Sequence, residues 1–460
     1  MEASIREIAE SIRNRRLSPV ELTKHCLERI EKLNPVLNAF ITVTAESALA
    51  AAQAAESEIQ QGNWRGPLHG VPMALKDLID TAGVATTAGS ALFQHRIPAA
   101  DAEVVRQLRQ AGAILLGKQS LHEFAYGGSS IISHFGEVRN PWNPAHIAGG
   151  SSGGSASAVA AGMCFAAIGT DTAGSIREPA ALCGIVGLKP TYGRVSARGV
   201  IPLSPSLDQV GPLTRTASDA ALVLQAIADP DAEDKTTANP TVPDFPAVPA
   251  KPAGKIRIGV PRKFFYEDLD QEVERAIEKA ISTLQDLGGI VHELELPVPT
   301  DRTLQSAESY AVHAENIARS PELYQPETLR RIRTGEKITA EEVLRRRREL
   351  AELRASIQSV FEEVDVLVTP TTPIPAPTIA ELKQNPDLLR TREILLLRNT
   401  RPANVWGLPA ISAPCGFTRR GLPIGLQIIG AAWREARVLQ VAHAFEQATA
   451  WHRHRPKISA

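Results

Sequence analysis

The sequence predicts an α/β fold in which helices cover a parallel or mixed β-sheet. A helical pattern over residues 101–112 leads into an apolar strand at 113–116 and then into a loop. In the same way, a helix of small residues at 156–162 leads into an apolar run at 163–168. Helices that alternate with short buried strands are typical of such a sheet.

Residues 1–66 are expected to form a helical lead-in that packs on the main body. Ser18 followed by Pro19 indicates a helix start, because serine can cap free amides and proline fits the first helical position. A second helix begins at Thr44 and ends near Gly62. The apolar stretch that follows predicts a strand with Lys76 at its end.

The rest of the chain is predicted to continue this pattern within a single domain of residues 1–460, although the length alone would also allow two domains. Six prolines between residues 229 and 255 predict an extended surface linker inside this domain. The segment 205–212 is rich in turn residues and is expected to be a loop ordered by the core. Further strands are expected at 256–260, 290–296, 364–368 and 424–430, and further helices at 218–227, 340–361 and 438–448.

The composition argues against several classes of partner. The 50 basic and 51 acidic residues give a net charge of −1, so we expect neither nucleic acid nor a membrane surface as a direct partner. No run of about 18 apolar residues could span a membrane, and the charged first 16 residues do not resemble a signal peptide. The four cysteines lack metal-ligand or paired spacing. We therefore expect a cytoplasmic protein with reduced thiols and no metal.

Two runs of glycine and serine carry the strongest chemical signal. They occupy residues 149–155 (GGSSGGS) and 169–177 (GTDTAGSIR). Ser175 falls just past a predicted strand end, where backbone N–H groups are left unpaired, and this makes it a candidate nucleophile. The alternative is that the glycines only serve turns and helix packing. The amides that can converge there on a developing oxyanion are those of Thr172, Ala173, Gly174 and Ser175.

Lys76 is a candidate general base. It lies between the apolar residues 73–75 and 78–79, which are a poor environment for a solvated ammonium group. Desolvation lowers the pKa of a lysine and makes its neutral, proton-accepting form available. The alternative is a lysine whose charged end reaches the surface, and the spacing alone does not decide between the two.

Four motifs in this order resemble those of the amidase signature family. They are Lys76 in its strand, the runs 149–155 and 169–177, and the segment 187–191. Ser151 and Ser175 are 24 residues apart, which is the spacing of the family. The similarity extends over about residues 18–216 and resumes at 366–377 and 404–430.

The resemblance implies an α/β/α sandwich with a large mixed β-sheet covered by helices on both faces. It also implies hydrolysis of an amide C–N bond to a carboxylate and ammonia or an amine through an acyl-enzyme, with no cofactor. Ser175 would be the nucleophile, Ser151 the bridging serine and Lys76 the base. Ser151 would follow Gly150 through a cis peptide bond. A serine hydroxyl is a weak nucleophile until a base takes its proton, which agrees with these roles.

Other residues of these motifs are expected to support the site. Ser152 would orient it by hydrogen bonds, while Asp171 and Arg177 would form a structural pair that fixes the loop. Ala173 stands where many family members carry glycine, and alanine restricts the backbone there if a positive φ is required. Substrate-binding residues are expected at Ala125, Tyr126 and Gly127.

Two kinds of amidase fit these motifs. The segment 122–127 (HEFAYG) looks more like stand-alone amidases than like the glutaminase component of the aspartyl/glutamyl-tRNA amidotransferase, which usually begins it with an acidic residue. We therefore expect a free hydrolase of a small-molecule amide. The alternative is the glutaminase component, which supplies ammonia to a partner subunit. The oligomeric state stays open, a homodimer being common at this size.

Two other classes of protein are less favoured. A Ser-His-Asp hydrolase does not fit, because no histidine has a motif-like context and Ser175 is not in a Gly-x-Ser-x-Gly sequence. A non-catalytic binding module would leave three motif-placed residues without a role.

Overall fold

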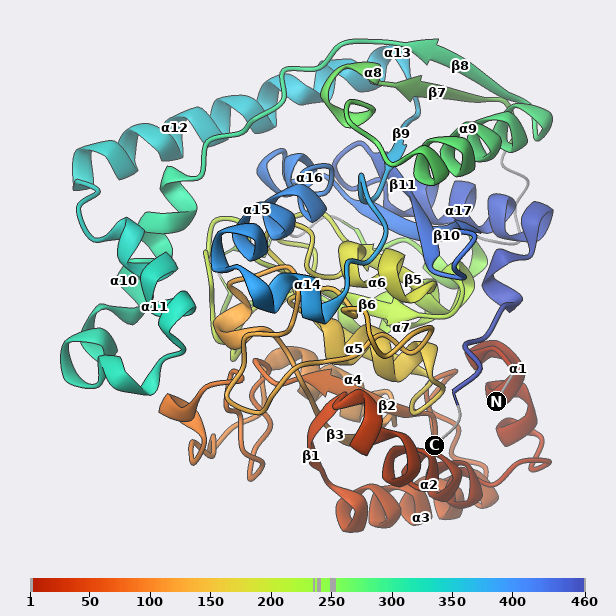
Figure 1. The fold of residues 1–460 in the computed structure, drawn as a ribbon. Coiled ribbons are helices and arrows are strands. Elements are labelled where there is room, and N and C mark those ends of the chain that lie inside the picture. Colours follow the sequence, from red (N-terminus) through yellow and green to blue (C-terminus); the bar gives the residue numbers. More distant parts are fainter. Residues whose placement is uncertain (1–2, 235, 238–240, 249–253, 459–460) are drawn as a thin grey trace.

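A mixed β-sheet forms the centre of the structure, a computed structural model that describes residues 3–234, 236–237, 241–248 and 254–458. Within these residues the sheet has eleven strands and runs from β1, low in the view, to β8 at the top (Figure 1). The spatial order is β1 (Phe40–Val43), β3 (Ile114–Gln119), β2 (Pro72–Lys76), β4 (Ala166–Asp171), β6 (Gln209–Thr214), β5 (Val186–Lys189), β10 (Ala410–Phe417), β11 (Pro423–Gly430), β9 (Val366–Pro370), β7 (Ile256–Val260) and β8 (Gly289–Glu293).

The sheet contains both kinds of strand pairing. β2 pairs in parallel with β3 and β4, and β7 pairs in parallel with β8 and β9. The remaining neighbours are antiparallel, including the hairpin of β10 and β11. The predicted large mixed sheet is therefore confirmed.

Helices cover both faces of this sheet. A Cβ at Gly425 in β11 would lie 2.5 Å from Ala181 in α6 (Arg177–Cys183). A Cβ at Gly430 in the same strand would lie 2.6 Å from Val438 in α17 (Glu435–Thr449). Positions an odd number apart on a strand face opposite sides, so α6 and α17 lie on opposite faces, as expected for an α/β/α fold.

The other helices surround these two layers (Figure 1). They are α1 (Ile5–Arg13), α2 (Pro19–Leu37), α3 (Ala45–Gln60), α4 (Glu103–Gln110), α5 (Gly153–Ala160), α7 (Ala217–Ile227), α8 (Arg262–Phe265), α9 (Gln271–Asp286), α10 (Thr303–Arg319), α11 (Pro326–Ile332), α12 (Ala340–Ser356), α13 (Val360–Glu363), α14 (Ile379–Gln384), α15 (Pro386–Leu396) and α16 (Arg401–Val405).

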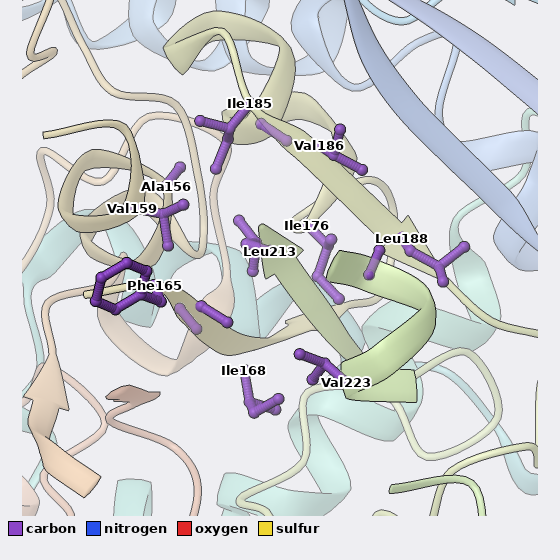
Figure 2. Close-up of a cluster of buried hydrophobic side chains, with 14 of the residues drawn as sticks. Ala156, Val159, Phe165, Ile168, Ile176, Ile185, Val186, Leu188, Leu213 and Val223 are labelled. Atoms are coloured by element: carbon purple, nitrogen blue, oxygen red, sulfur yellow. The ribbon is translucent and has the colours of Figure 1, made fainter. Parts of the chain in front are cut away.

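Glycines in the strands let α6 pack closely on the sheet. A Cβ at Gly187 in β5 would lie 2.7 Å from the Cβ of Ala180 in α6. Ile176, which precedes α6, is fully buried. Figure 2 shows it among Ile168, Leu188 and Leu213 from β4, β5 and β6. This packing fixes the start of α6, and Ser175 is the residue before Ile176.

The strand predicted at 163–168 lies further along the chain than expected. Met163, Cys164 and Phe165 are buried but belong to the turn after α5, and β4 begins at Ala166. An apolar run indicates burial, whereas pairing with neighbouring strands decides where a strand begins. Ser175 still lies just past the end of this strand, as predicted.

The loop predicted at 205–212 is wrong in its second half, because β6 begins at Gln209 and lies in the middle of the sheet between β4 and β5. Gly211 and Pro212 are typical of turns, and for this reason the sequence pattern predicted a loop here instead of a strand. Gly211 is required by packing, since a Cβ there would lie 2.9 Å from Pro190 Cδ and closer still to the carbonyl of Leu188.

The proline-rich segment 229–255 lies partly outside the described residues. Its described part is anchored to the core, because Phe245 in a short 3-10 helix (Phe245–Ala247) is fully buried. Asp231 in the same segment is also buried, and it accepts a hydrogen bond from Arg198 Nε at 2.8 Å. These contacts do not fit a wholly exposed linker.

Several elements escaped the sequence patterns, among them β1, α9, α10, α11 and α15. In α10 the buried residues include Gln305, Glu308, Ser309 and His313. These polar side chains interrupt the apolar stripe by which a buried helix is recognised in a sequence.

Candidate active site

Asp171 holds the loop that carries Ser175. Its carboxylate accepts hydrogen bonds from the amides of Gly174 (2.7 Å) and Ile176 (3.1 Å) and from Arg177 Nε (3.0 Å). Burial alone would raise the pKa of Asp171, but the charge and hydrogen bonds of Arg177 lower it to about 2. Asp171 and Arg177 therefore form a buried ion pair that fixes the loop between β4 and α6.

Arg177 connects this loop to distant parts of the chain. Its side chain is fully buried and donates to the carbonyl of Thr400 (2.8 Å), to Gln427 Oε1 (2.6 Å) and to Asn404 Oδ1 (2.6 Å). Charge-assisted hydrogen bonds of this kind are the strong ones. The loop is thus tied both to β11 and to α16.

Lys76 lies at the end of β2 and is fully buried, so it does not reach the surface. Its Nζ donates to Ser151 Oγ at 2.7 Å and to Thr170 Oγ1 at 2.8 Å. The parallel pairing of β2 with β4 places Lys76 next to Thr170, because both strands end at the same edge of the sheet. Of the two predicted serines, the structure brings Ser151 into direct contact with the lysine.

Burial lowers the pKa of Lys76 to about 7, although the charges of Asp171 and Asp208 oppose this shift. Desolvation disfavours the charged form of an amine when no carboxylate touches it. Two other buried lysines have different contacts. Lys118 lies 3.4 Å from the carboxylate of Asp77 and also donates to Thr86 Oγ1, and Lys189 donates to the carbonyls of Pro190 and Leu408. The hydrogen bonds of Lys76 go to two hydroxyl groups.

The loop that carries Ser151 lies against the loop that carries Ser175. The peptide bond between Gly150 and Ser151 is cis, as the resemblance implies. The amide of Ser152 donates to the carbonyl of Ser175 at 3.2 Å, and Ser152 Oγ donates to the carbonyl of Thr170 at 3.2 Å. Ser152 thus joins the loop to both β4 and the residue predicted as nucleophile.

The predicted oxyanion loop needs one revision. Of its four amides, that of Gly174 already donates to Asp171, which leaves three. In the described part of the chain, the amides of Thr172, Ala173 and Ser175 have no hydrogen-bond acceptor. Gly174 has a φ of +134°, whereas Ala173 is not among the residues of positive φ. The alanine therefore fits the loop without strain.

The three residues predicted to bind substrate do not line one pocket. Ala125 lines a cavity of about 350 Å³ together with Thr170 and Thr172. Tyr126 lines a separate, smaller cavity. Gly127 packs on the ring of His122, where a Cβ would lie within 2.5 Å of Nδ1. Ala125 thus shares a cavity with Thr170, which contacts Lys76, whereas Tyr126 lines a different cavity and Gly127 contacts the buried ring of His122.

A larger cavity lies elsewhere. It measures about 880 Å³, lies between α3 and residues 81–84, and none of the predicted site residues lines it. Within the described residues, no group of histidine, cysteine and acidic side chains could hold a metal ion, and no helix is both long and apolar enough to cross a membrane.

Comparison with known proteins agrees with this geometry. The model of the Amidase family matches residues 21–439. The chain belongs to the amidase family. The family and enzyme class predicted from the sequence are thereby confirmed.

Relatives of this amidase include both kinds of protein considered above. It is 40% identical to a glutamyl-tRNA(Gln) amidotransferase component of Coxiella burnetii (strain Dugway 5J108-111), over 99% of each chain. The native peptide amidase of Stenotrophomonas maltophilia has a similar structure, with a TM-score of 0.87, 32% identity and coverage of 100% of this chain and 99% of that one. A 6-aminohexanoate cyclic dimer hydrolase gives a TM-score of 0.89 at 29% identity, with coverage of 99% and 98%.

Three residues that contact the candidate site escaped the sequence analysis. Thr170 contacts Lys76, Thr400 Oγ1 donates to the carbonyl of Ala173 at 2.7 Å, and Glu178 accepts from the amide of Gly150 at 2.7 Å. Thr170 lies inside the second glycine–serine run and Glu178 directly follows it. Their place at this motif was therefore a signal in the sequence that they belong near the candidate site. No local pattern marks Thr400.

Proposed function

We propose that this amidase hydrolyses a carboxamide with Ser175 as nucleophile, Ser151 as proton relay and Lys76 as base. The observation that carries the proposal is the 2.7 Å contact between Lys76 Nζ and Ser151 Oγ in a fully buried site. A lysine with a pKa of about 7 is present in part as the free amine near neutral pH. Such an amine can accept a hydroxyl proton, which is what an activated serine requires.

In the proposed reaction, Ser175 Oγ attacks the amide carbonyl carbon. Its proton passes to Ser151 Oγ while the Ser151 proton passes to Lys76 Nζ. The relay then runs in reverse, so that a proton reaches the nitrogen as the C–N bond breaks and ammonia or an amine leaves. Water attacks the resulting ester of Ser175 with help from the same relay, and the carboxylic acid is released. Every proton that leaves a hydroxyl is returned, so no cofactor is required.

The oxyanion formed in each attack would be held by the free amides of the nucleophile loop. Those of Thr172, Ala173 and Ser175 are the candidates, since the Gly174 amide is engaged by Asp171. A preorganised donor of this kind lowers the barrier by about 3 to 4 kcal/mol. The cavity of about 350 Å³ that reaches Thr170 and Thr172 would admit the substrate.

We propose a free hydrolase that acts on small amides, supported by the histidine at the start of the segment 122–127. The second candidate is a glutaminase component that delivers ammonia to a partner subunit. It is favoured by the curated relatives, which are named as components of the glutamyl-tRNA(Gln) amidotransferase at 39–41% identity. A reducing compartment such as the cytoplasm is compatible with both candidate functions, because all four cysteines are free and buried.

The test is ammonia release by the purified chain alone, on glutamine, aliphatic amides, aryl amides and amino-acid amides. Ser175→Ala removes the proposed nucleophile. Ser155→Ala is the matched control, because Ser155 lies in the first glycine–serine run and its buried hydroxyl has no hydrogen-bond partner in the described residues. Turnover that Ser175→Ala abolishes and Ser155→Ala retains supports the proposal. Activity that arises only with partner subunits and charged tRNA supports the second candidate, and turnover that survives Ser175→Ala contradicts both.

A further inference from the structure

The residues on either side of Ser151 are both held by the segment that begins at Ser175. The amide of Ser152 donates to the carbonyl of Ser175 at 3.2 Å. The amide of Gly150 donates to Glu178 Oε2 at 2.7 Å. The serine of the proposed relay is therefore fixed from both sides by one short stretch of chain, the start of α6 and the residue that precedes it by two positions.

Glu178 extends from a firmly held helix start. It is the second residue of α6, and its own amide donates to the carbonyl of Gly174 at 2.7 Å. The preceding residue, Arg177, is hydrogen-bonded to Gln427 in β11 and to Asn404 in α16. The side chain of Glu178 is fully buried, so the protein fixes the place of its carboxyl group.

Glycines let this carboxyl group reach the backbone of the loop. Gly149 has a φ of +83°, and a Cβ there would lie 2.6 Å from Glu178 Oε2. A Cβ at Gly150 would lie 2.9 Å from the amide nitrogens of Ser129 and Ser130. Neither position accepts a side chain unless a neighbour moves. The loop is thus packed between the carboxyl group and the backbone of residues 129–130.

The contact with Gly150 has no substitute nearby. The carbonyl of Ser151 accepts from the amide of His122 at 3.2 Å and from Ser130 Oγ at 3.3 Å. Within the described residues, however, the amide of Gly150 has no acceptor other than Glu178. A buried N–H group without an acceptor is costly. Loss of the carboxyl group should therefore shift the loop toward a new acceptor or toward water.

No cation compensates a charge on Glu178. Across the part of the chain that the structure describes, its Oε1 has no hydrogen-bond partner, and no basic group contributes to its electrostatics. The neighbouring Arg177 uses its side-chain donors on other acceptors, among them Asp171. Burying an unpaired carboxylate costs far more free energy than leaving a neutral hydroxyl without an acceptor.

The surroundings of Glu178 also favour its uncharged form. Burial raises the pKa of Glu178 well above its usual range, although the hydrogen bond from Gly150 opposes this shift. The charges of Glu393 on α15 and of Asp171 at the end of β4 raise the pKa further. Cys183 at the end of α6 is the other titratable neighbour, and burial raises the pKa of its thiol as well. All of these neighbours are acidic groups or thiols, which cannot stabilise a carboxylate.

We propose that Glu178, as an uncharged carboxylic acid, is a positioning residue that holds the Gly150 amide and so fixes Ser151 in the proton relay. One carboxyl oxygen accepts the hydrogen bond and the other carries the proton. Glu178 acts through geometry, because a displacement of about 1 Å at a reacting group can lower a rate by about 10²-fold. The inference rests on the proposed function, in which Ser151 passes the proton of Ser175 to Lys76.

Three variants distinguish positioning from a contribution to stability alone. Glu178→Gln keeps an uncharged group with an acceptor oxygen, and its kcat should stay within about 3-fold of the wild-type value. Glu178→Ala removes the acceptor and should lower kcat by about 10²-fold, with KM changed by less than about 3-fold. Glu446→Ala is the matched control, because Glu446 on α17 is also a buried carboxyl group that accepts from a backbone amide, that of Ala217 at 2.9 Å.

The control should lower the midpoint of urea unfolding, as Glu178→Ala does, but should retain kcat. The two residues belong to helices on opposite faces of the sheet. Equal losses of kcat in Glu446→Ala and Glu178→Ala would reduce the role of Glu178 to stability and overturn the inference. Unchanged kcat in Glu178→Ala would overturn it too.

The pH profile of kcat/KM reports the charge of Glu178. With an uncharged Glu178, the acid limb of Glu178→Gln should coincide with that of the wild type. A charged Glu178 would stabilise the ammonium form of Lys76, so that its removal would move the limb to lower pH. Such a move would contradict the uncharged form, as would a loss of kcat in Glu178→Gln as large as in Glu178→Ala.

Crystal structures of the variants decide the positioning without turnover, even if no amide is hydrolysed and the proposed function fails. The distance between Lys76 Nζ and Ser151 Oγ should stay near 2.7 Å in Glu178→Gln. In Glu178→Ala, Ser151 should move away from the lysine. A loop that keeps its course in Glu178→Ala would reject the role of Glu178.

A second measurement applies if Glu178→Ala does not fold. Carbon-13 NMR of wild type and Glu178→Gln, both labelled at the carboxyl carbon of the glutamate side chains, identifies the resonance of Glu178 as the one that the variant lacks. At neutral pH this resonance should have the chemical shift of a protonated carboxyl group. The shift of a carboxylate would overturn the inference.

Discussion

Lys76 Nζ and Ser151 Oγ are 2.7 Å apart in a site where neither side chain is exposed, although 75 residues separate them in the chain. The lysine comes from the end of a parallel strand, and the serine comes from a loop that also contacts the backbone of Ser175. A hydroxyl that accepts a hydrogen bond from a buried lysine can pass its proton to the free amine, which is the step that the proposed relay needs.

The pH dependence of kcat/KM should report the pKa of Lys76. Burial lowers that pKa to about 7, and only the free amine can accept a proton. Activity should therefore rise with pH below about 7 and level off above it. Lys76→Arg should be inactive throughout, because a guanidinium stays protonated. A profile that is flat across neutral pH would argue against a lysine base.

Ser151→Ala should lower kcat by roughly 10³-fold or more, because Ser175 would lose the hydroxyl through which its proton leaves. Ser155→Ala should retain activity, since its hydroxyl has no partner within the described residues. Steady-state kinetics on the best amide measures both variants. Comparable activity of the two would remove Ser151 from the mechanism.

Gly174→Ala should abolish activity by distorting the nucleophile loop. The residue has a φ of +134°, and a Cβ there would lie 2.6 Å from Thr400 Cβ and closer to its hydroxyl. Thr400 holds the carbonyl of Ala173, so its displacement would move the free amides. Gly62→Ala is the control, because Gly62 also has a positive φ but no atom within 4 Å of such a Cβ.

The Gly62 control should cost only about 1 kcal/mol of stability and leave kcat unchanged. Circular dichroism would confirm that Gly174→Ala still folds. Normal turnover by folded Gly174→Ala would show that the shape of this loop is not required.

Asp171→Asn should destabilise the protein by about 3 to 5 kcal/mol, because it leaves the buried Arg177 without its counter-charge. Urea unfolding would measure the change. Glu21→Gln is the control, since the exposed pair of Glu21 and Lys24 should contribute less than about 1 kcal/mol.

The same carboxylate predicts a pH dependence of stability. Its pKa is about 2 in the folded protein, against 3.8 as the reference value. The unfolded chain therefore binds more protons between these values, and the contribution of Asp171 is lost as pH falls from about 4 to about 2. Asp171→Asn should lack this part of the acid sensitivity. Parallel curves for wild type and variant would contradict the assignment.

Ser175 and Lys76 could be singled out as candidates because their signals are local, whereas the role of Ser151 came from the resemblance to the amidase signature family. Ser151 and Ser175 lie in runs of glycine, and Lys76 ends an apolar strand. Such patterns describe what each short segment can do with its own backbone. They also predicted a parallel or mixed sheet covered by helices, and the family resemblance then favoured the mixed one.

Local patterns failed to predict secondary structure where glycine, proline or polar residues are placed by contacts with distant parts of the chain. Gly211 and Pro212 suggested a loop, yet both belong to a central strand whose neighbours leave no room for a side chain at Gly211. The buried polar residues of α10 interrupt the apolar pattern of that helix. Two of them find their partners in other segments, since Glu308 accepts from Ser204 and His313 contacts the hydroxyl of Tyr324.

The sequence by itself thus determined the family, the class of fold and the chemical identity of the proposed nucleophile, relay and base. Only the tertiary structure decided that Lys76 meets Ser151, that Asp171 occupies the amide of Gly174, and that Glu178 accepts from the amide of Gly150. The physical reason is that these contacts join segments far apart in the chain or depend on the exact course of a loop. They follow from strand order and side-chain packing, which no short stretch of sequence contains.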